Sequence, residues 1–87
     1  MDDMKDLIVI KNDGEKETFS DDKIVTSIAK SGVDIKESER IANVIKEHFK
    51  SNSIDGEVKS ADIRKMVVEE LLKVDSVASA SYDSYKN

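Results

Sequence analysis

The N-terminal part of the chain carries one strong β-hairpin signal. Residues 7–11 form a short apolar, β-branched run, and residues 16–19 (Lys-Glu-Thr-Phe) form a second segment suited to a strand. Between them stands Asn-Asp-Gly at residues 12–14, where glycine adopts positive φ without steric cost. The pattern predicts a hairpin with a loop of about three to five residues.

Helical periodicity dominates the rest of the chain. The clearest stripe has the spacing i, i+3, i+4, i+7, i+8 and consists of Ile41, Val44, Ile45, His48 and Phe49. A wider apolar face follows it, and we expect the helix that carries this face to be the most buried one. That face consists of Ile63, Met66, Val67, Val68, Leu71, Leu72 and Val74.

Polar residues and glycine mark the helix boundaries. The first helix is expected to stop near Gly32, and the last is expected to start at Asp75 or Ser76. The expected N-caps are Ser20, Asp34 and Ser60.

The order of these elements predicts an α+β fold. Residues 57–59 (Glu-Val-Lys) suit a short third strand. A small three-stranded sheet, made of the N-terminal hairpin and this strand, is expected to cap a bundle of about four helices. We assign residues 1–6 to an N-terminal tail and residues 7–87 to a single domain.

The composition argues against several kinds of site. The absence of cysteine excludes zinc ribbons, redox dithiols and iron–sulfur sites, and a single histidine makes a multi-histidine metal centre implausible. No nucleophile–base pair is recognisable, and the three glycines lie too far apart for a phosphate-binding loop. We therefore expect a protein that is not an enzyme.

The net charge and the hydropathy of the chain indicate which partners to expect. The chain has 14 basic and 19 acidic residues, a net charge of −5, which argues against sequence-independent nucleic-acid binding. We therefore expect no DNA binding by the domain on its own. The longest apolar run covers only residues 7–10, and the start of the chain lacks the features of a signal peptide. A cytoplasmic protein without a membrane partner is expected.

The hairpin and the helix after it combine cations with apolar side chains. Lys11 and Lys23 lie in the same stretch as Glu17 and Phe19. A nucleotide requires cations for its phosphates and an apolar surface for its base. Taken alone, these charges also fit the solvated surface of a small sheet.

Three sequence blocks together resemble the ATP-cone domain. Residues 9–14 (Val-Ile-Lys-Asn-Asp-Gly), followed by Glu-Thr-Phe at 17–19 and Lys-Ile at 23–24, are similar to its opening Val-x-Lys-Arg-Asp-Gly, Glu-x-Phe and Lys-Ile. Residues 60–71 are similar to its Ser-x-x-Ile-x-x-x-Val-Glu-x-x-Leu stretch, and residues 77–86 resemble its terminal Val-Ala-x-x-x-Tyr-x-x-Tyr-Arg. The blocks follow one another in the family's order over nearly the whole chain.

The resemblance implies a sheet-capped helical bundle that binds ATP or dATP without consuming it. Such domains regulate ribonucleotide reductase catalytic subunits and occur in the repressor of the reductase genes. We therefore expect a non-catalytic module that acts through association with another subunit or with itself, including action in trans on a ribonucleotide reductase or a similar enzyme. Mg²⁺ is expected to accompany the nucleotide. The repressor version of the family carries a zinc ribbon, so the absence of cysteine argues against that version.

By matched position, the resemblance implies roles for five residues of the first block. Lys11 would contact the phosphates. Glu17 and Ser20 would orient the adenine and ribose, Ile24 would provide an apolar wall, and Lys23 would supply a cation.

The remaining matched positions lie in the later blocks and in the turn. Ser60 and Arg64 would approach the sugar and phosphates, and Lys86 would reach back as a terminal cation. An ion pair between Arg64 and Glu17 is the alternative to ligand contact. The family usually has arginine where this chain has Asn12, and losing that cation should weaken phosphate binding or shift the preference among di- and triphosphates. The alternative function is a degenerate cone that mediates protein–protein interaction without nucleotide.

Overall fold

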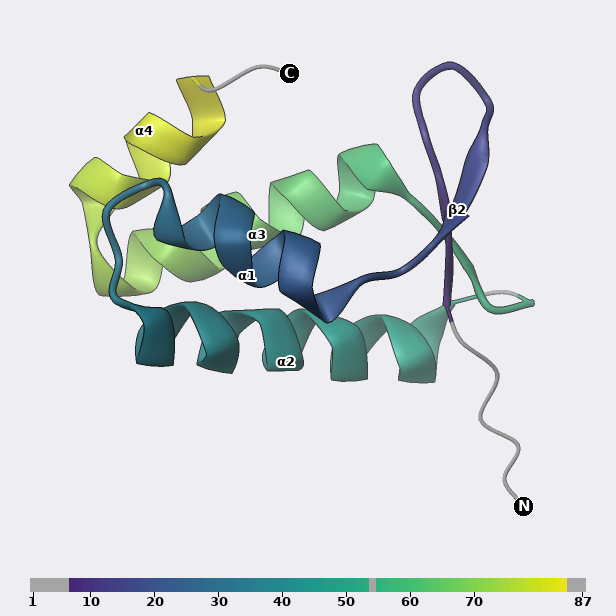
Figure 1. Cartoon of the computed structure of the whole chain (residues 1–87), viewed down its shortest axis with the longest axis horizontal. Helices are drawn as coiled ribbons and strands as arrows, with labels where there is room; N and C mark the ends of the chain where they lie inside the picture. Colours follow the sequence, from purple (N-terminus) through teal and green to yellow (C-terminus); the bar gives the residue numbers. More distant parts are fainter. Residues whose placement is uncertain (1–6, 54, 85–87) are drawn as a thin grey trace.

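A mixed sheet of three short strands lies at one end of the molecule (Figure 1). The computed structural model describes residues 7–53 and 55–84. The strands are β1 (Ile8–Ile10), β2 (Lys16–Thr18) and β3 (Glu57–Lys59), in the order β2-β1-β3. β1 pairs antiparallel with β2 and parallel with β3. The predicted hairpin and third strand are confirmed.

The turn between β1 and β2 is closed by its own polar groups. Gly14 has a φ of 91°, and its N–H donates to the carbonyl of Lys11 at 2.9 Å. The Asp13 carboxylate accepts a hydrogen bond from the N–H of Glu15 at 3.0 Å. These local bonds close the hairpin and hold Asn12 in the turn.

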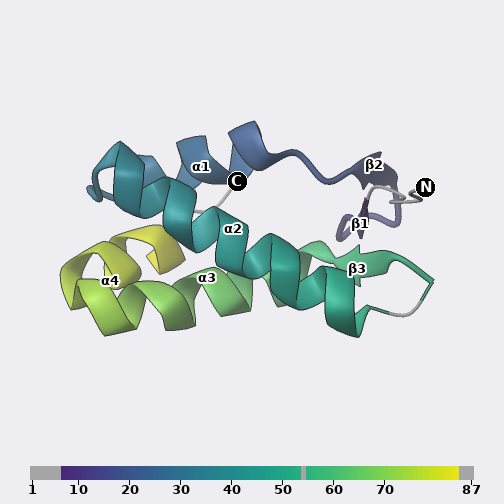
Figure 2. The same cartoon turned by 90° about the horizontal axis from the view of Figure 1, so that it is seen from below.

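Four helices make up most of the described chain: α1 (Asp21–Ala29), α2 (Ile35–Asn52), α3 (Ser60–Val74) and α4 (Ser76–Ser84). α1 packs on α2, α2 on α3, and α3 on α4, so that α1 and α2 form one side of the bundle and α3 and α4 the other (Figure 2). The sheet covers one end of this bundle, which confirms the predicted α+β fold. Within the described residues, no helix is long and apolar enough to cross a membrane.

Two of the three predicted N-caps are confirmed. The Ser20 hydroxyl accepts a hydrogen bond from the N–H of Lys23 at 3.3 Å, and the Asp34 carboxylate accepts one from the N–H of Glu37 at 2.9 Å. Each bond satisfies one of the N–H groups that a helix start leaves without an intrahelical partner.

The third predicted N-cap, Ser60, is wrong. α3 begins at Ser60 itself, and its N-cap is Lys59, which makes no side-chain cap hydrogen bond. The reason is that β3 runs directly into α3: Lys59 ends the strand, and the backbone of the next residue is already helical. The start of α3 therefore lacks the side-chain acceptor that α1 has.

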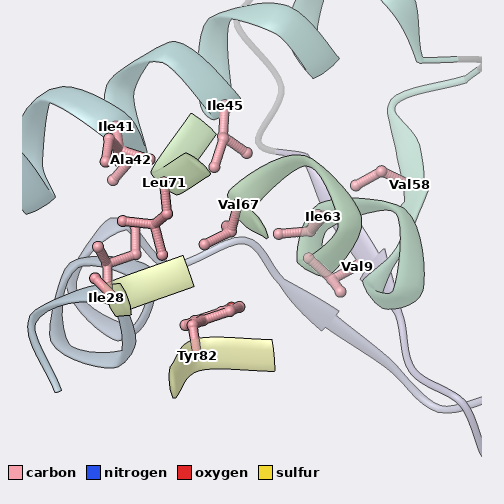
Figure 3. Close-up of a cluster of buried hydrophobic side chains, with 11 residues drawn as sticks. Val9, Ile28, Ile41, Ala42, Ile45, Val58, Ile63, Val67, Leu71 and Tyr82 are labelled. Atoms are coloured by element: carbon pink, nitrogen blue, oxygen red, sulfur yellow. The ribbon is translucent and has the colours of Figure 1, made fainter. Parts of the chain in front are cut away.

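The core lies between the helices and against the inner face of the sheet (Figure 3). It consists of Val9, Ile28, Ile41, Ala42, Ile45, Val58, Ile63, Val67, Leu71, Ala78 and Tyr82. The stripe predicted on α2 contributes two of its isoleucines. His48, at the far end of that stripe, is exposed, and its ring meets Phe49 edge-on with the ring centroids 4.9 Å apart.

The prediction that the third helix is the most buried one is wrong. α3 buries three residues along one line, whereas Leu72 is 57% exposed and Val74 is 45% exposed. Each residue of a helix is turned by about 100° from the one before it, so Leu72 falls off the line of Leu71 that faces the core. Val77, at the start of α4, is 77% exposed. Leu72 and Val74 lie at the end of α3 and Val77 at the start of α4, and we call these three exposed apolar residues the α3–α4 corner.

Candidate functional site

A cavity of about 740 Å³ opens where the hairpin, α1 and α3 meet. Its walls come from the hairpin and the segment after it, from one face of α1, from the start of α3 and from one residue of α4. The lining residues are Val9, Asn12, Glu17, Thr18, Phe19, Ser20, Lys23, Ile24, Ser27, Lys30, Ser60, Ala61, Ile63, Arg64 and Tyr82. The volume falls within the range of roughly 300–1,000 Å³ that is usual for small-molecule sites.

The cavity shares part of its lining with the hydrophobic core. Val9, Ile63 and Tyr82 line it and also belong to the buried cluster (Figure 3). Phe19 and Ile24 are half-buried and pack against the same cluster. These apolar side chains are therefore held in place by the packing of the whole domain.

The structure brings seven of the nine predicted site residues to this cavity. They are Asn12, Glu17, Ser20, Lys23, Ile24, Ser60 and Arg64. Lys11 does not line the cavity; it is exposed at the start of the hairpin turn, where its N–H donates to the carbonyl of Glu15 at 2.7 Å. Lys86 lies outside the described residues.

The cavity is positively charged in an acidic protein. Its charged lining residues are the cations Lys23, Lys30 and Arg64 and the acid Glu17, which gives three positive charges against one negative charge, or +2. The whole chain carries −5. A charge reversal confined to one concave surface favours an anionic ligand there.

The acid in the lining is paired with one of the cations. Lys23 Nζ lies 3.5 Å from the Glu17 carboxylate, and the two side chains are 72% and 40% exposed. An exposed pair at this distance contributes little to stability, typically about 0–1 kcal/mol. Both side chains can therefore turn toward a ligand at small cost. The acid Glu17 pairs with Lys23, and not with Arg64 as the sequence alternative had it.

Arg64 connects the cavity to α4. Its Nη2 donates to the carbonyl of Tyr82 at 3.1 Å and to the carbonyl of Asp83 at 3.0 Å. The guanidinium carbon also lies 5.2 Å from the centroid of the Tyr82 ring, within the range of a cation–π contact. The guanidinium is therefore held at the cavity wall by a neighbouring helix.

The start of α3 adds a second source of positive potential. Ser60 and Ala61, its first two residues, line the cavity, and its N-cap makes no side-chain cap hydrogen bond. The N-terminus of a helix carries partial positive charge and N–H donors that suit phosphate or carboxylate oxygens. Together with the three cations, this helix start makes the cavity suited to an anion that also has an apolar part.

The sequence profile of the ATP cone domain matches residues 7–87. The chain belongs to the ATP cone domain family. An ATP cone is a regulatory domain whose effectors are ATP and dATP.

Curated relatives of this ATP cone are transcriptional repressors. Transcriptional repressor NrdR 3 of Paramagnetospirillum magneticum is 38% identical over 97% of this chain and 58% of its own length. Transcriptional repressor NrdR of a Geobacillus species is 39% identical over 90% of this chain and 53% of its own length, and that of Streptococcus sanguinis is 36% identical over 93% and 56%. The chain therefore spans a little more than half the length of these relatives.

These relatives correct the predicted partners. The expectation of no DNA binding by the domain on its own is contradicted, because the relatives that match it are named transcriptional repressors. The net charge of one domain is a poor guide when that domain covers only part of such a protein. The argument from the absence of cysteine against the repressor version is also contradicted by these relatives, which are named repressors.

Eight of the 15 lining residues were not among the predicted site residues, and two of these eight, Ser27 and Lys30, follow a simple sequence pattern. Ser27 lines the cavity on the same face of α1 as Lys23, and Lys30, the C-cap of α1, continues the spacing i, i+4 and i+7. Helical periodicity applied to the polar residues after Lys23 would have found both of them. Among the described residues, no group of three or more His, Cys, Asp or Glu side chains is placed to hold a metal ion.

Proposed function

We propose that the chain is a non-catalytic regulatory module of the cytoplasm that binds ATP or dATP in the cavity and acts through protein association. The observation that carries the proposal is the reversed charge of the cavity, +2 in a chain of −5, beside an apolar wall. An adenine nucleotide combines the two properties that this lining selects: a polyanionic phosphate chain and a flat, largely apolar base.

The lining divides into a phosphate half and a base half. Lys23, Lys30 and Arg64, with the start of α3, would hold the phosphates through charge-assisted hydrogen bonds. Phe19 and Ile24, which pack on the core, would support the base.

Polar groups in the cavity would orient the base and the sugar. Glu17, Ser20 and Ser60 stand in the lining as donors or acceptors, and Asn12 offers an amide where the family usually has arginine. Lys11 and Lys86 remain proposed cations from the matched positions. Mg²⁺ would enter with the triphosphate, because no described acidic cluster binds it.

The α3–α4 corner supports the association part of the proposal. Leu72, Val74 and Val77 are 57%, 45% and 77% exposed in a chain of which 38% of the residues are charged. Where exposed apolar side chains adjoin one another on a surface, they commonly serve protein contacts. The partner would be a second copy, a ribonucleotide reductase or similar enzyme acted on in trans, or a regulator of transcription, the class to which the relatives belong.

Titration calorimetry with ATP, dATP and ADP tests the binding. We expect Lys23→Ala to lower the affinity about tenfold, because a hydrogen bond to a charged group contributes about 1.5 kcal/mol or more. Lys11→Ala should have a smaller effect, because Lys11 stands outside the cavity lining. Lys36→Ala, an exposed lysine of α2 away from the cavity, serves as the control.

Two results would contradict the binding proposal. No heat and no thermal shift at millimolar nucleotide would favour the degenerate cone, for which the substitution at Asn12 is the supporting observation. A larger loss for Lys11→Ala than for Lys23→Ala would place the nucleotide at the hairpin turn instead of in the cavity.

Sedimentation velocity tests the association. The sedimentation coefficient of the chain is measured with and without saturating nucleotide, alone and with a candidate partner subunit. A coefficient that responds to ATP or dATP supports a nucleotide-controlled module. If nucleotide binds but the sedimentation coefficient stays the same with every partner tried, the domain binds nucleotide without regulating association. That result would contradict the regulatory role.

A further inference from the structure

The C-terminal end of α4 is held by a side chain from another helix. The last four carbonyls of a helix have no intrahelical partner, and a cation near them is favourable because this end carries partial negative charge. α4 has no basic residue in its own last turn. Arg64 of α3 donates to the carbonyls of Tyr82 and Asp83 instead, so α3 contributes a cap to the end of α4.

The rest of α4 is fixed independently of Arg64. At its start, the Asp75 carboxylate accepts hydrogen bonds from the N–H groups of Val77 and Ala78 at 3.0 and 3.1 Å. In its middle, the Ser79 hydroxyl donates to the carbonyl of Val68 at 2.9 Å. Loss of the Arg64 contacts would therefore loosen only the last turn of the helix.

The same guanidinium stands in the wall of the cavity. The carbonyls of Tyr82 and Asp83 that it contacts are neutral acceptors, whereas a phosphate is an anion with several acceptor oxygens. A phosphate adds ionic attraction to the hydrogen bonds that it accepts from a guanidinium, and arginine is suited to bidentate phosphate contacts. A phosphate within reach would therefore compete with these two carbonyls for Arg64.

We propose that Arg64 couples the cavity to the end of α4: a phosphate group bound in the cavity draws the guanidinium away from the carbonyls of Tyr82 and Asp83 and releases the last turn of α4. The proposal rests on the proposed function, since it requires a nucleotide in the cavity. It assigns to α4 the task of reporting occupancy of the cavity to whatever the domain contacts.

Amide hydrogen exchange of the full chain, followed by NMR, tests the coupling. With saturating ATP, the amides of residues 80–84 should exchange several-fold faster than without it, whereas the amides of residues 77–79 should keep their rates. Calorimetry on the same sample reports whether ATP is bound. Absence of binding would overturn the proposed function itself, while binding with unchanged or slower exchange at residues 80–84 would overturn only the coupling.

Arg64→Lys separates the charge from the forked geometry. A lysine keeps one positive charge at the cavity but presents a single ammonium, which is poorly suited to hold two carbonyls and contact the Tyr82 ring. In this variant residues 80–84 should exchange fast without nucleotide, and ATP should cause little further change. The neighbouring exposed Lys65→Ala is the control and should behave like the wild type. Slow exchange at residues 80–84 in ligand-free Arg64→Lys would show that another contact holds α4.

Discussion

Two helices, α1 and α3, begin at the same cavity, and their beginnings are built differently. α1 is preceded by Ser20, whose hydroxyl accepts a hydrogen bond from the N–H of Lys23, and acidic residues occupy its first turn. α3 follows β3 without a break, its N-cap is Lys59, and no side chain caps it. A serine stands near the start of each helix, but only the first one serves as a cap.

The difference assigns separate tasks to the two helix starts. The cap of α1 satisfies an N–H group with an atom of the protein and stabilises the domain whether or not a ligand is present. The start of α3 contributes less to stability, but its N–H groups remain suited to an anion in the cavity. α3 must therefore be held by its packed face, and α1 is held partly by its end.

The largest expected effect concerns the packed face of α3. Leu71 is fully buried, and Leu71→Ala should lower the free energy of unfolding by about 3 kcal/mol through lost burial and the cavity that it leaves. Leu72→Ala, one residue further on, should change it by less than about 0.5 kcal/mol because Leu72 is mostly exposed. Urea unfolding followed by circular dichroism measures both. Equal losses in the two variants would mean that α3 is packed on a different face.

These adjacent leucines show how far the sequence predicts the fold. The spacing of apolar residues on α3 correctly predicts a helix with a buried line, but residue type alone does not separate Leu71 from Leu72. The difference arises from where α2 and α4 lie around α3, which is a tertiary property. The hairpin turn and the caps Ser20 and Asp34 were predictable because each depends on atoms only two or three residues away.

The distinction between features set by local sequence and features set by tertiary packing applies to the cavity as well. Seven matched positions line it, and helical spacing on α1 could have added Ser27 and Lys30. The contacts of Arg64 with Tyr82 and Asp83 join residues separated by 18 and 19 positions. They depend on the return of α4 along α3, so local sequence patterns could not predict them.

A smaller effect is expected at the two serines themselves. Ser20→Ala removes the cap of α1 and should lower the free energy of unfolding by about 1 kcal/mol. For a domain of this size, that corresponds to a fall in Tm of about 4–8 °C. Ser60→Ala should change the Tm far less, because Ser60 caps nothing. Thermal unfolding followed by circular dichroism measures both variants, and a loss for Ser60→Ala as large as that for Ser20→Ala would remove the contrast between the helix starts.

The smallest expected effect on stability comes from a substitution that gives α3 the side-chain cap that it lacks. Lys59→Ser places a hydroxyl at the N-cap, while Lys59→Ala removes the same lysine without adding an acceptor. The serine variant should be more stable than the alanine variant by about 0.5–1 kcal/mol.

The same pair of variants tests whether the open helix start contacts the nucleotide. The serine hydroxyl would compete with a phosphate for the first-turn N–H groups of α3, so Lys59→Ser should bind ATP several-fold more weakly than Lys59→Ala. Both variants lose the same positive charge, and any difference in affinity therefore reports on the cap alone. Urea unfolding and titration calorimetry measure the two quantities. If Lys59→Ser is more stable than Lys59→Ala but the two variants bind ATP equally well, the N–H groups of α3 do not contact the nucleotide. Phosphate binding would then rest on Lys23, Lys30 and Arg64.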